Sequence, residues 1–317
     1  MQSSLPLAPA DIPTMYFIGV TTTRSSIMSV FPEWARFLGI GDCRIKGLDL
    51  KIHDEAQAYR SAVQFIKSDP LSLGALVTTH KIDLLEACRD LFDDLDDLAL
   101  ALGEVSSISK EGHRLAGHAK DPITSGLALE AFLPEDYWRT GAEVFIIGAG
   151  GAAVALSWHL MQNQFAPNQP SKIHVSDRAM MRLEEMRHVH KQIASTVPVE
   201  YHHCPRPEDN DAVVAALRAK SLVVNATGLG KDAPGSPLTD AVVFPANGIA
   251  WDFNYRGNLV FLDQARAQQA SRGLQIEDGW IYFIHGWTRV IAEVFHLDIP
   301  TKGERFDKLS RIAAKAR

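Results

Sequence analysis

The sequence has few features that would indicate a secreted, membrane-bound or metal-dependent protein. Its 317 residues include only three cysteines, Cys43, Cys88 and Cys204, which are too far apart in sequence to suggest a metal-binding pair or a disulfide framework. No apolar run reaches the length of about 20 residues that a membrane-spanning helix needs. The N-terminal segment also lacks the basic and apolar regions of a secretory signal. We therefore expect a cytoplasmic protein with no metal and no membrane partner.

The charge balance excludes a further class of partner. The formal net charge is −6, so there is no basic excess that would favour nucleic acid or an anionic membrane surface. Hydrophobic residues make up 46% of the chain, which is enough for one large or two ordinary globular domains. We expect a small-molecule substrate and a monomer or homodimer.

The most informative segment is Val144 to Ala153, which reads V-F-I-I-G-A-G-G-A-A. An apolar, β-favouring run leads directly into a glycine-rich turn, and Leu156 and Leu160 then continue at helical spacing. A strand, a tight glycine turn and a helix N-terminus in this order can bind a dinucleotide pyrophosphate, because backbone N–H groups approach the phosphates closely. The alternative is an ordinary buried strand with a tight turn.

Apolar strands alternate with helical stretches along most of the chain, which is typical of a mostly parallel α/β sheet. The first part predicts strands at 16–21, 44–52, 73–78 and 105–108, with helices at 27–38 and 55–67 and an acidic helical region at 82–102. The second part predicts strands at 144–147, 172–176, 199–202, 222–225 and 248–252. Two helices, at 279–295 and 302–316, end the chain.

This order predicts an α/β protein of two domains with a cleft between them. We expect an N-terminal, mostly parallel α/β substrate domain at residues 1–127. We expect a Rossmann dinucleotide-binding domain at residues 128–278, and C-terminal helices at 279–317 that pack back on the first domain.

Several segments, in the right order over nearly the whole chain, resemble the shikimate/quinate dehydrogenase family. The segment G-A-L-V-T-T-H-K, ending at Lys81, resembles the family segment that carries the catalytic lysine. The segment G-H-A-K-D, ending at Asp121, is similar to the one that ends in the catalytic aspartate. The remaining matches are Gly19 and Ser25, Gly103 to Ser107, Asn225 to Thr227, Asp252 to Tyr255, and Gly279. The resemblance implies a nicotinamide-linked alcohol dehydrogenase that uses no metal.

The resemblance assigns the proton transfer to Lys81 and Asp121. Oxidation of an alcohol requires a group that accepts the hydroxyl proton while hydride leaves for the nicotinamide. A lysine paired with an aspartate does this, because the ammonium stabilises the developing oxyanion and passes on a proton. Each residue follows a predicted strand, so both are expected to face the cleft. Outside the family context, Lys81 would be a solvated surface residue and Asp121 a helix N-cap before Pro122.

The sequence departs from the family where shikimate would be held. Family members that bind shikimate contact its hydroxyls with asparagines at the positions of Leu76, Ser106 and Ala119, and a usual glutamine falls at Gly286. Each lost hydrogen bond weakens binding by about 0.5–1.5 kcal/mol, and by more where a substrate hydroxyl stays buried without a partner. We therefore expect retained chemistry on another small cyclic polyol or hydroxy acid. A genuine shikimate/quinate dehydrogenase remains the alternative.

Five polar side chains remain as candidates for holding the substrate. The family places substrate contacts at the positions of Ser25 and Tyr255. Thr78 belongs to the lysine segment, and Arg24 offers a bidentate grip for a carboxylate. His285 stands beside the replaced glutamine. Alternatively, Arg24 is an ordinary surface arginine, and His285 is a core histidine whose hydrogen bonds are made within the protein.

The cofactor is expected to be NAD rather than NADP. Asp177 ends the strand after the glycine-rich turn, where a carboxylate accepts hydrogen bonds from the ribose hydroxyls and repels a 2′-phosphate. Arg178, with Arg182 four residues later on the same helical face, keeps NADP open. We expect Phe253 to pack against the nicotinamide ring. The expected dinucleotide contacts are Gly148, Ala149, Gly150, Gly151, Ala152, Ala153, Asp177, Arg178, Asn225, Ala226, Thr227, Phe253 and Gly279.

Three other functions compete with this interpretation. The first is a regulatory protein that binds the dinucleotide without turnover, although retention of Lys81 and Asp121 argues against it. The second is a folate-linked methylene dehydrogenase, but the neighbourhood of Lys81 lacks the tyrosine that those enzymes place one turn earlier. The third is a metal hydrolase, for which only the His202-His203-Cys204 triplet is available.

Overall fold

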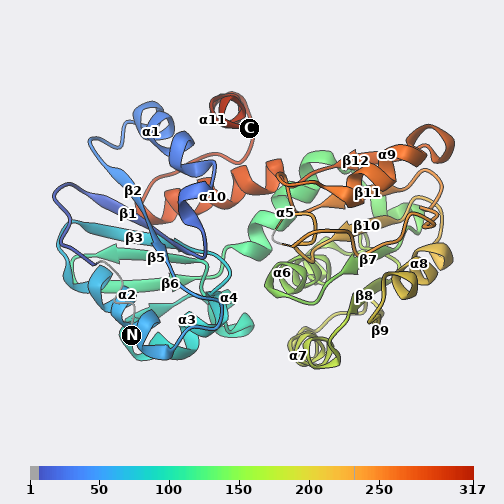
Figure 1. Ribbon diagram of the computed structural model, residues 1–317, viewed down its shortest axis with the longest axis horizontal. Helices are drawn as coiled ribbons and strands as arrows, with labels where there is room; N and C mark the ends of the chain where they lie inside the picture. The colour runs from blue at the N-terminus through green and yellow to red at the C-terminus, as the bar shows by residue number, and fades with distance from the viewer. Residues whose placement is uncertain (1–6, 232) are drawn as a thin grey trace. The chain divides into compact units, whose positions relative to one another are not determined.

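The computed structural model describes residues 7–231 and 233–317, and the chain divides into two units (Figure 1). The first unit contains the residues up to Lys120 together with Ile284–Arg317, and the second contains Asp121–Phe283. The predicted domain limits, after residue 127 and before residue 279, lie close to these boundaries. Within the described residues, every helix is too short or too polar to span a bilayer.

The first unit is built on a six-stranded sheet of order β2-β1-β3-β5-β6-β4. Strand β1 pairs in parallel with β2 and β3, whereas β5 runs antiparallel to both β3 and β6. The sheet is therefore parallel on one side and carries an antiparallel hairpin on the other. Its strands are β1 Thr14–Gly19, β2 Arg44–Asp49, β3 Ser72–Val77, β4 Asp94–Leu95, β5 Ser107–Glu111 and β6 Arg114–His118.

The continuous helical region predicted at 82–102 is wrong. Helix α3 (Lys81–Cys88) ends in a short 3₁₀ turn, the two-residue strand β4 follows, and α4 (Asp97–Leu102) begins only then. The Asp96 carboxylate accepts a hydrogen bond from Ala99 N (2.7 Å), so it caps a new helix rather than continuing the old one. The strand predicted at 105–108 is displaced to β5, and its hairpin partner β6 was not predicted.

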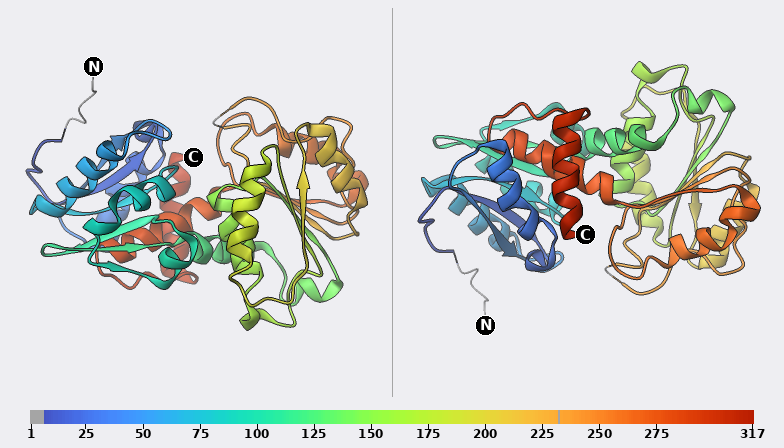
Figure 2. Two further views of the ribbon diagram at one scale, coloured as in Figure 1. Left: turned by 90° about the horizontal axis from the view of Figure 1, so that it is seen from below. Right: turned by 90° about the horizontal axis from the view of Figure 1, so that it is seen from above.

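Two neighbouring aromatic residues of β1 show how helices cover both faces of this sheet. Successive side chains of a strand point to opposite faces. Tyr16 packs edge-on against Phe65 of α2, whereas Phe17 packs against Trp287 of α10, with ring centroids 5.6 and 4.9 Å apart. The C-terminal helix α11 lies beside α1 (Figure 2), and Trp34 Nε1 of α1 donates to Leu309 O of α11 (2.9 Å). The predicted return of the C-terminal helices to the first unit is confirmed.

The second unit has a wholly parallel six-stranded sheet of order β12-β11-β10-β7-β8-β9. The chain runs outward from β7 to β9, returns to the centre at β10 and continues outward to β12. This is the doubly wound Rossmann order, in which ligands bind where the strand order reverses. Its strands are β7 Val144–Ile147, β8 Ile173–Asp177, β9 Val199–His203, β10 Leu222–Asn225, β11 Ile249–Asp252 and β12 Gln275–Glu277.

Both faces of this sheet are buried. On one face, Ile146 and Val175 pack with residues of α6 and α7 such as Leu156 and Met186, and on the other, Phe145 and Val223 pack with residues of α8 and α9. The α-helices of the chain are α1 Ile27–Leu38, α2 Ala56–Ser68, α3 Lys81–Cys88, α4 Asp97–Leu102, α5 Asp121–Phe132, α6 Gly151–Leu160, α7 Met180–His190, α8 Pro207–Ala216, α9 Val260–Arg272, α10 Trp280–Val294 and α11 Glu304–Ala313. Short 3₁₀ turns are η1 Thr22–Arg24, η2 Arg89–Leu91, η3 Tyr137–Thr140, η4 Asn163–Phe165 and η5 Ala314–Ala316.

Gly279, which directly precedes α10, and Gly286, which lies inside it, provide a matched test of packing. A Cβ added at Gly279 would lie 2.0 Å from the backbone oxygen of Phe253, whereas one added at Gly286 would meet no atom within 4 Å. Gly279→Ala should therefore destabilise the fold by about 1–3 kcal/mol through overpacking. Gly286→Ala should stabilise it by about 0.5–1 kcal/mol, because alanine loses less conformational entropy in a helix. Urea unfolding of both variants checks this, and equal effects would contradict the packing at Gly279.

Candidate functional site

The glycine-rich turn lies at the carboxyl end of β7, next to the carboxyl end of β10. Gly148 has φ +105°, a conformation that L side chains rarely adopt, and a Cβ there would lie 3.0 Å from Ala226 O. Its N–H donates to Ser176 O (2.7 Å), and α6 begins three residues later with Gly150 at its N-cap. Backbone N–H groups and the positive end of the helix dipole are therefore brought to the point where strand order reverses, as anion binding requires.

Asp177 is held against this turn. One carboxylate oxygen, Oδ2, accepts from Ala149 N (2.9 Å), and the other, Oδ1, accepts from Ala179 N (2.8 Å). The half-buried carboxylate thus has a fixed orientation at the end of β8. Arg178 is exposed, and Arg182 forms an ion pair with Glu185 (3.1 Å).

The loops after β10 and β11 are joined by buried amides and a carboxylate. Asn225 Nδ2 donates to Asp252 Oδ2 (3.0 Å), and its Oδ1 accepts from the hydroxyl of Thr227 (2.7 Å). Asp252 also accepts from Asn254 N (2.8 Å). Burial raises the pKa of Asp252 to about 6, although these hydrogen bonds favour the charged form. The network fixes Ala226 and Thr227 beside Gly148.

Aromatic side chains surround Phe253, which is predicted to contact the nicotinamide, and Tyr255, a candidate substrate contact. Phe253 packs on Trp251 and Tyr282, with centroids 4.5 and 4.9 Å apart, while Tyr255 packs on Trp280 (5.1 Å) and Phe283 (4.8 Å). The close approach of Gly279 to Phe253 holds the start of α10 against the loop after β11. Both Phe253 and Tyr255 are partly exposed.

In the first unit, the candidate residues follow the carboxyl ends of β1 and β3. Gly19 ends β1 between Thr22 and Thr78, since a Cβ there would meet a methyl group of each at 3.0 Å. Ser25 follows η1, and Arg24 is exposed at its end. Lys81 is the first residue of α3, and its carbonyl accepts from Val105 N (3.1 Å).

The two predicted catalytic residues belong to different units. Lys81 is half-buried in the first unit, and Asp121 is the first residue of α5 in the second. Within the second unit, the Tyr282 hydroxyl makes a long hydrogen bond to Asp121 Oδ2 (3.5 Å). The pairing of Lys81 with Asp121 stays a prediction.

Leu76, Ser106 and Ala119, where the resemblance would place asparagines, offer little hydrogen-bonding capacity to a substrate. Ala119 is fully buried, and Leu76 is apolar. The buried Ser106 uses its hydroxyl within the fold: it accepts from Lys120 N (2.7 Å) and makes a long bond to His118 O (3.4 Å). These three side chains therefore do not replace the family's amides.

Sequence reasoning missed a half-buried cluster of charge in the first unit. Lys120 Nζ lies 2.7 Å from Glu293 and 3.8 Å from Asp96, and His118 lies 3.4 and 3.5 Å from the same carboxylates. Burial raises the pKa values of Asp96 and Glu293, but His118, Lys120 and other hydrogen-bond donors outweigh it and hold both below their usual values. The sequence could have drawn attention to Lys120 because it directly precedes Asp121. Its partner on α10, Glu293, is distant in sequence, so the ion pair itself could not be recognised.

His285 is buried more deeply than expected for a residue that contacts substrate. Its ring is only 2% exposed and stacks on Phe306 with centroids 4.5 Å apart. Among the described residues, its Nδ1 has no hydrogen-bond partner. Burial lowers its pKa to about 4, so the ring is neutral at pH 7.

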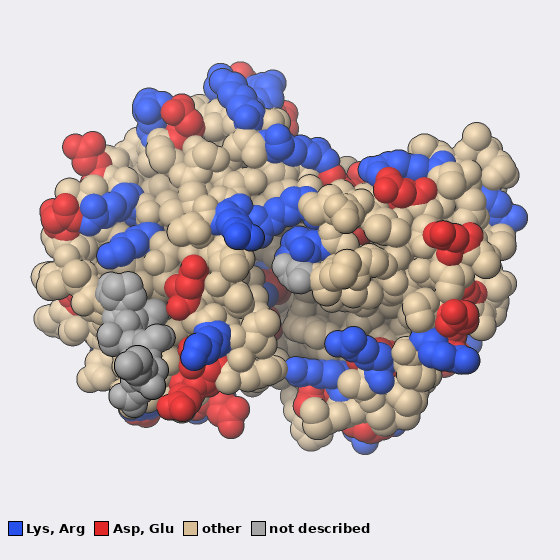
Figure 3. All heavy atoms as spheres, viewed as in Figure 1, with Lys and Arg blue, Asp and Glu red and all other residues tan. Residues whose placement is uncertain are grey.

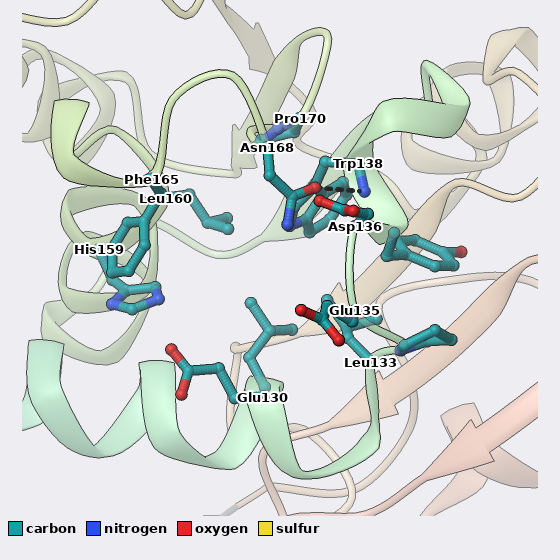
Figure 4. A pocket seen from close by; sticks show the side chains of 13 residues that line it. Glu130, Leu133, Glu135, Asp136, Trp138, His159, Leu160, Phe165, Asn168 and Pro170 are labelled. Atoms are coloured by element: carbon teal, nitrogen blue, oxygen red, sulfur yellow. Dashed lines mark hydrogen bonds between the residues drawn. The ribbon is translucent and has the colours of Figure 1, made fainter.

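A separate cavity of about 340 Å³ opens in the second unit at the other end of α6 (Figure 4). Glu130, His159 and Phe165 are among the side chains that face it, and all its lining residues lie between Leu129 and Pro170. Since α6 spans ten residues, or roughly 15 Å, the cavity lies far from the glycine-rich turn. It is not part of the predicted dinucleotide site.

The face of the molecule drawn in Figure 3 has no extensive patch of a single charge. Lys and Arg side chains are interspersed with Asp and Glu over the face seen in Figure 3. This distribution agrees with the small net charge of the sequence.

Comparison with known proteins gives a consistent set of relatives. No protein-family model matches the chain. It is 28% identical over 188 residues to a shikimate dehydrogenase (NADP⁺) of Streptococcus gordonii, covering 59% of this chain and 60% of the relative. It is 26% identical over 269 residues to a shikimate dehydrogenase (NADP⁺) of Brucella canis, covering 83% and 81%. The chain thus spans about 60% of the length of the first of these relatives.

The fold is also found among solved structures. The quinate dehydrogenase of Corynebacterium glutamicum, solved in complex with NAD, superimposes with a TM-score of 0.71 at 19% identity. The alignment covers 96% of this chain and 100% of that one. The predicted fold class, an α/β protein with a Rossmann sheet in its second unit, is confirmed.

The burial of His285 predicts a loss of stability in mild acid. Its pKa is lower in the folded state, about 4, than the ordinary value of 6.5, so the unfolded state binds more protons between these values. Stability is therefore full above pH 6.5 and falls as the pH drops towards 4. His285→Gln stays neutral, so between pH 7.5 and 4.5 it should lose roughly 2–3 kcal/mol less than the parent protein.

Urea unfolding at the two pH values measures this difference. The exposed His113 provides the control, and His113→Gln should behave like the parent. An identical pH dependence for His285→Gln and the parent would show that His285 is not buried as a neutral ring.

Proposed function

We propose that this chain, a member of the shikimate/quinate dehydrogenase family, is an NAD(P)-dependent dehydrogenase. It oxidises a secondary alcohol of a small cyclic polyol or hydroxy acid, or reduces the corresponding ketone. The observation that carries this proposal is the glycine-rich turn at the strand-order reversal of a Rossmann sheet, with Asp177 and the Asn225 network beside it. The names of the relatives, two shikimate dehydrogenases (NADP⁺) and a quinate dehydrogenase with NAD, support the same class of reaction.

The residues of the glycine-rich turn suit a nicotinamide dinucleotide. At Gly148 and Gly150 no side chain obstructs the turn, and the N-terminus of α6 would hold the pyrophosphate. The exposed Thr227 and the partly exposed Phe253 and Ala226 would contact the nicotinamide half. When bound, the dinucleotide supplies or accepts the hydride.

The chain itself supplies the proton transfer. In the oxidation direction, the Lys81–Asp121 pair accepts the proton of the substrate hydroxyl, and the lysine ammonium stabilises the oxygen as negative charge develops. In the reduction direction, the same pair returns the proton to the carbonyl oxygen. Positioned acid–base catalysis of this kind contributes about 10²–10⁴-fold.

We propose that the substrate is not shikimate. Leu76 and Ala119 offer no polar side-chain atom, and Ser106 already hydrogen bonds within the fold. A site that leaves substrate hydroxyls buried without partners rejects that substrate strongly. Ser25, Thr78, Arg24, Tyr255 and His285 remain the candidate contacts, and the burial of His285 makes it the least accessible of them. The relatives' names favour the alternative, a genuine shikimate dehydrogenase.

A substrate panel tests the reaction and the specificity together. Formation of NADH and NADPH is followed with shikimate, quinate, inositols, other cyclic polyols and sugar acids. We expect turnover of an alcohol other than shikimate, and a decrease of kcat by about 10²–10⁴-fold in Lys81→Met and in Asp121→Asn. The exposed Lys51 provides a matched control, since Lys51→Met should leave kcat unchanged.

The outcomes separate the alternatives. Efficient turnover of shikimate would refute the changed specificity while leaving the family chemistry intact. Dinucleotide binding without turnover of any substrate would favour a regulatory protein. Full activity in Lys81→Met would remove Lys81 from the mechanism.

We further propose that NAD is preferred, because the fixed carboxylate of Asp177 would repel a 2′-phosphate. Asp177→Ser removes that charge, and the ratio of kcat/KM for NADP to that for NAD should rise about tenfold or more, equivalent to roughly 1.4 kcal/mol. Asp42→Ser, at an exposed position of the first unit, should leave the ratio unchanged. An unchanged ratio in Asp177→Ser would rule out Asp177 as the selective residue.

A further inference from the structure

Three potential metal ligands share one face of the Rossmann sheet. In the register of β8 and β9, His174 lies opposite Glu200, and Ser176 lies opposite His202. Alternate residues of a strand point to the same face, so His174, Glu200 and His202 are neighbours on the surface of two paired strands. Strand β9 is the edge of the sheet.

The ligand atoms of these residues are already close together. His174 Nδ1 lies 3.1 Å from His202 Nε2 and 3.5 Å from Glu200 Oε2, and the remaining side, from His202 Nε2 to Glu200 Oε2, is 4.0 Å. Zn²⁺ bound tetrahedrally at about 2.0–2.1 Å from each ligand requires ligand atoms about 3.3 Å apart. Small side-chain movements would therefore bring one ion within bonding distance of all three atoms.

A lysine holds one oxygen of the carboxylate ligand. Lys172 Nζ lies 2.5 Å from Glu200 Oε1, which leaves Oε2 on the side of the histidines, 3.5 Å from His174 Nδ1. The ammonium of Lys172 also opposes a second positive charge, so it sets an upper limit on affinity.

A fourth side chain, the carboxylate of Glu143, lies near the buried His174. His174 is only 8% exposed, and its Nε2 has no hydrogen-bond partner among the described residues. The nearest carboxylate oxygen, Glu143 Oε1, is 3.8 Å away, and Glu143 is itself anchored by the backbone N–H of Arg218 (3.1 Å). A metal on Nδ1 would place the ring proton on Nε2, pointing to Glu143, which is the carboxylate–histidine–metal arrangement of many sites.

We propose that His174 Nδ1, His202 Nε2 and Glu200 Oε2 bind a divalent transition metal of the Zn²⁺ class. The ion would link edge strand β9 to β8, and the partly exposed His202 and Glu200 would leave a fourth position for water. The site differs from the His202-His203-Cys204 triplet considered from the sequence. His203 Nε2 lies 3.1 Å from Arg178 O, and Cys204 is buried, so only His202 of that triplet belongs to it.

The test uses untagged full-length protein, freed of metal with a chelator and titrated with ZnCl₂ at pH 7.5 in a calorimeter. We expect one equivalent to bind and the thermal midpoint to rise with Zn²⁺ concentration. His202→Gln and Glu200→Gln should each weaken binding at least about tenfold, since each removes one of three protein ligands. His203→Gln, a neighbouring change on the same strand, should bind like the parent.

A second readout depends on geometry rather than affinity. Co²⁺ in place of Zn²⁺ should give the visible absorption of a tetrahedral ion in the parent and in His203→Gln, and lose it in His202→Gln. Thermal midpoints without metal identify any variant that fails to fold. Glu200→Gln changes a half-exposed residue and gives an independent test.

Absence of Zn²⁺ binding, or binding that is equally strong in His202→Gln and Glu200→Gln, would overturn the proposal. Equal weakening in His203→Gln would place the metal elsewhere. The result does not depend on the proposed dehydrogenase activity, because the readouts are binding, stability and absorption.

Discussion

The dinucleotide-binding arrangement depends on the close approach of two backbones at the point where the strand order reverses. Gly148 adopts φ +105°, and a Cβ there would lie 3.0 Å from Ala226 O, so a side chain would be strained and would crowd the loop after β10. Because the turn is this tight, α6 begins directly above the strand ends, and Ala149 N reaches Asp177. The Asn225–Asp252 pair then fixes the opposing loop. One steric constraint thus positions the candidate contacts for the pyrophosphate, the ribose and the nicotinamide.

The part of the fold that follows from local sequence was predictable. Strands buried on both faces read as continuous apolar runs, as in V-F-I-I before Gly148 and L-V-V-N at β10, and these were placed to within a residue. The glycine-rich turn is recognisable for the same reason, because its requirement for small residues is local. Five of the six strands of the Rossmann sheet were therefore predicted, whereas the three-residue strand β12 was not.

The features that were missed depend on contacts distant in sequence or on very short elements. The pattern of 82–102 is amphipathic throughout, but Asp96 starts a new helix because its carboxylate also accepts from Ala119 N, 23 residues away. Strand β4 has two residues and no periodicity to detect. The partners of Lys120 and of His174 lie on other elements, so neither the charged cluster nor the three-ligand group could be recognised from spacing alone.

The charged cluster constrains which residue can precede Asp121 in the sequence. Lys120 balances Asp96 and Glu293, and all three are half-buried. Removal of one partner from a buried charge group leaves the others uncompensated, which costs far more than loss of an exposed ion pair. Change of Lys120 alone would leave two carboxylates facing each other with only His118 between them. Stability therefore favours a positively charged residue directly before Asp121 in the sequence.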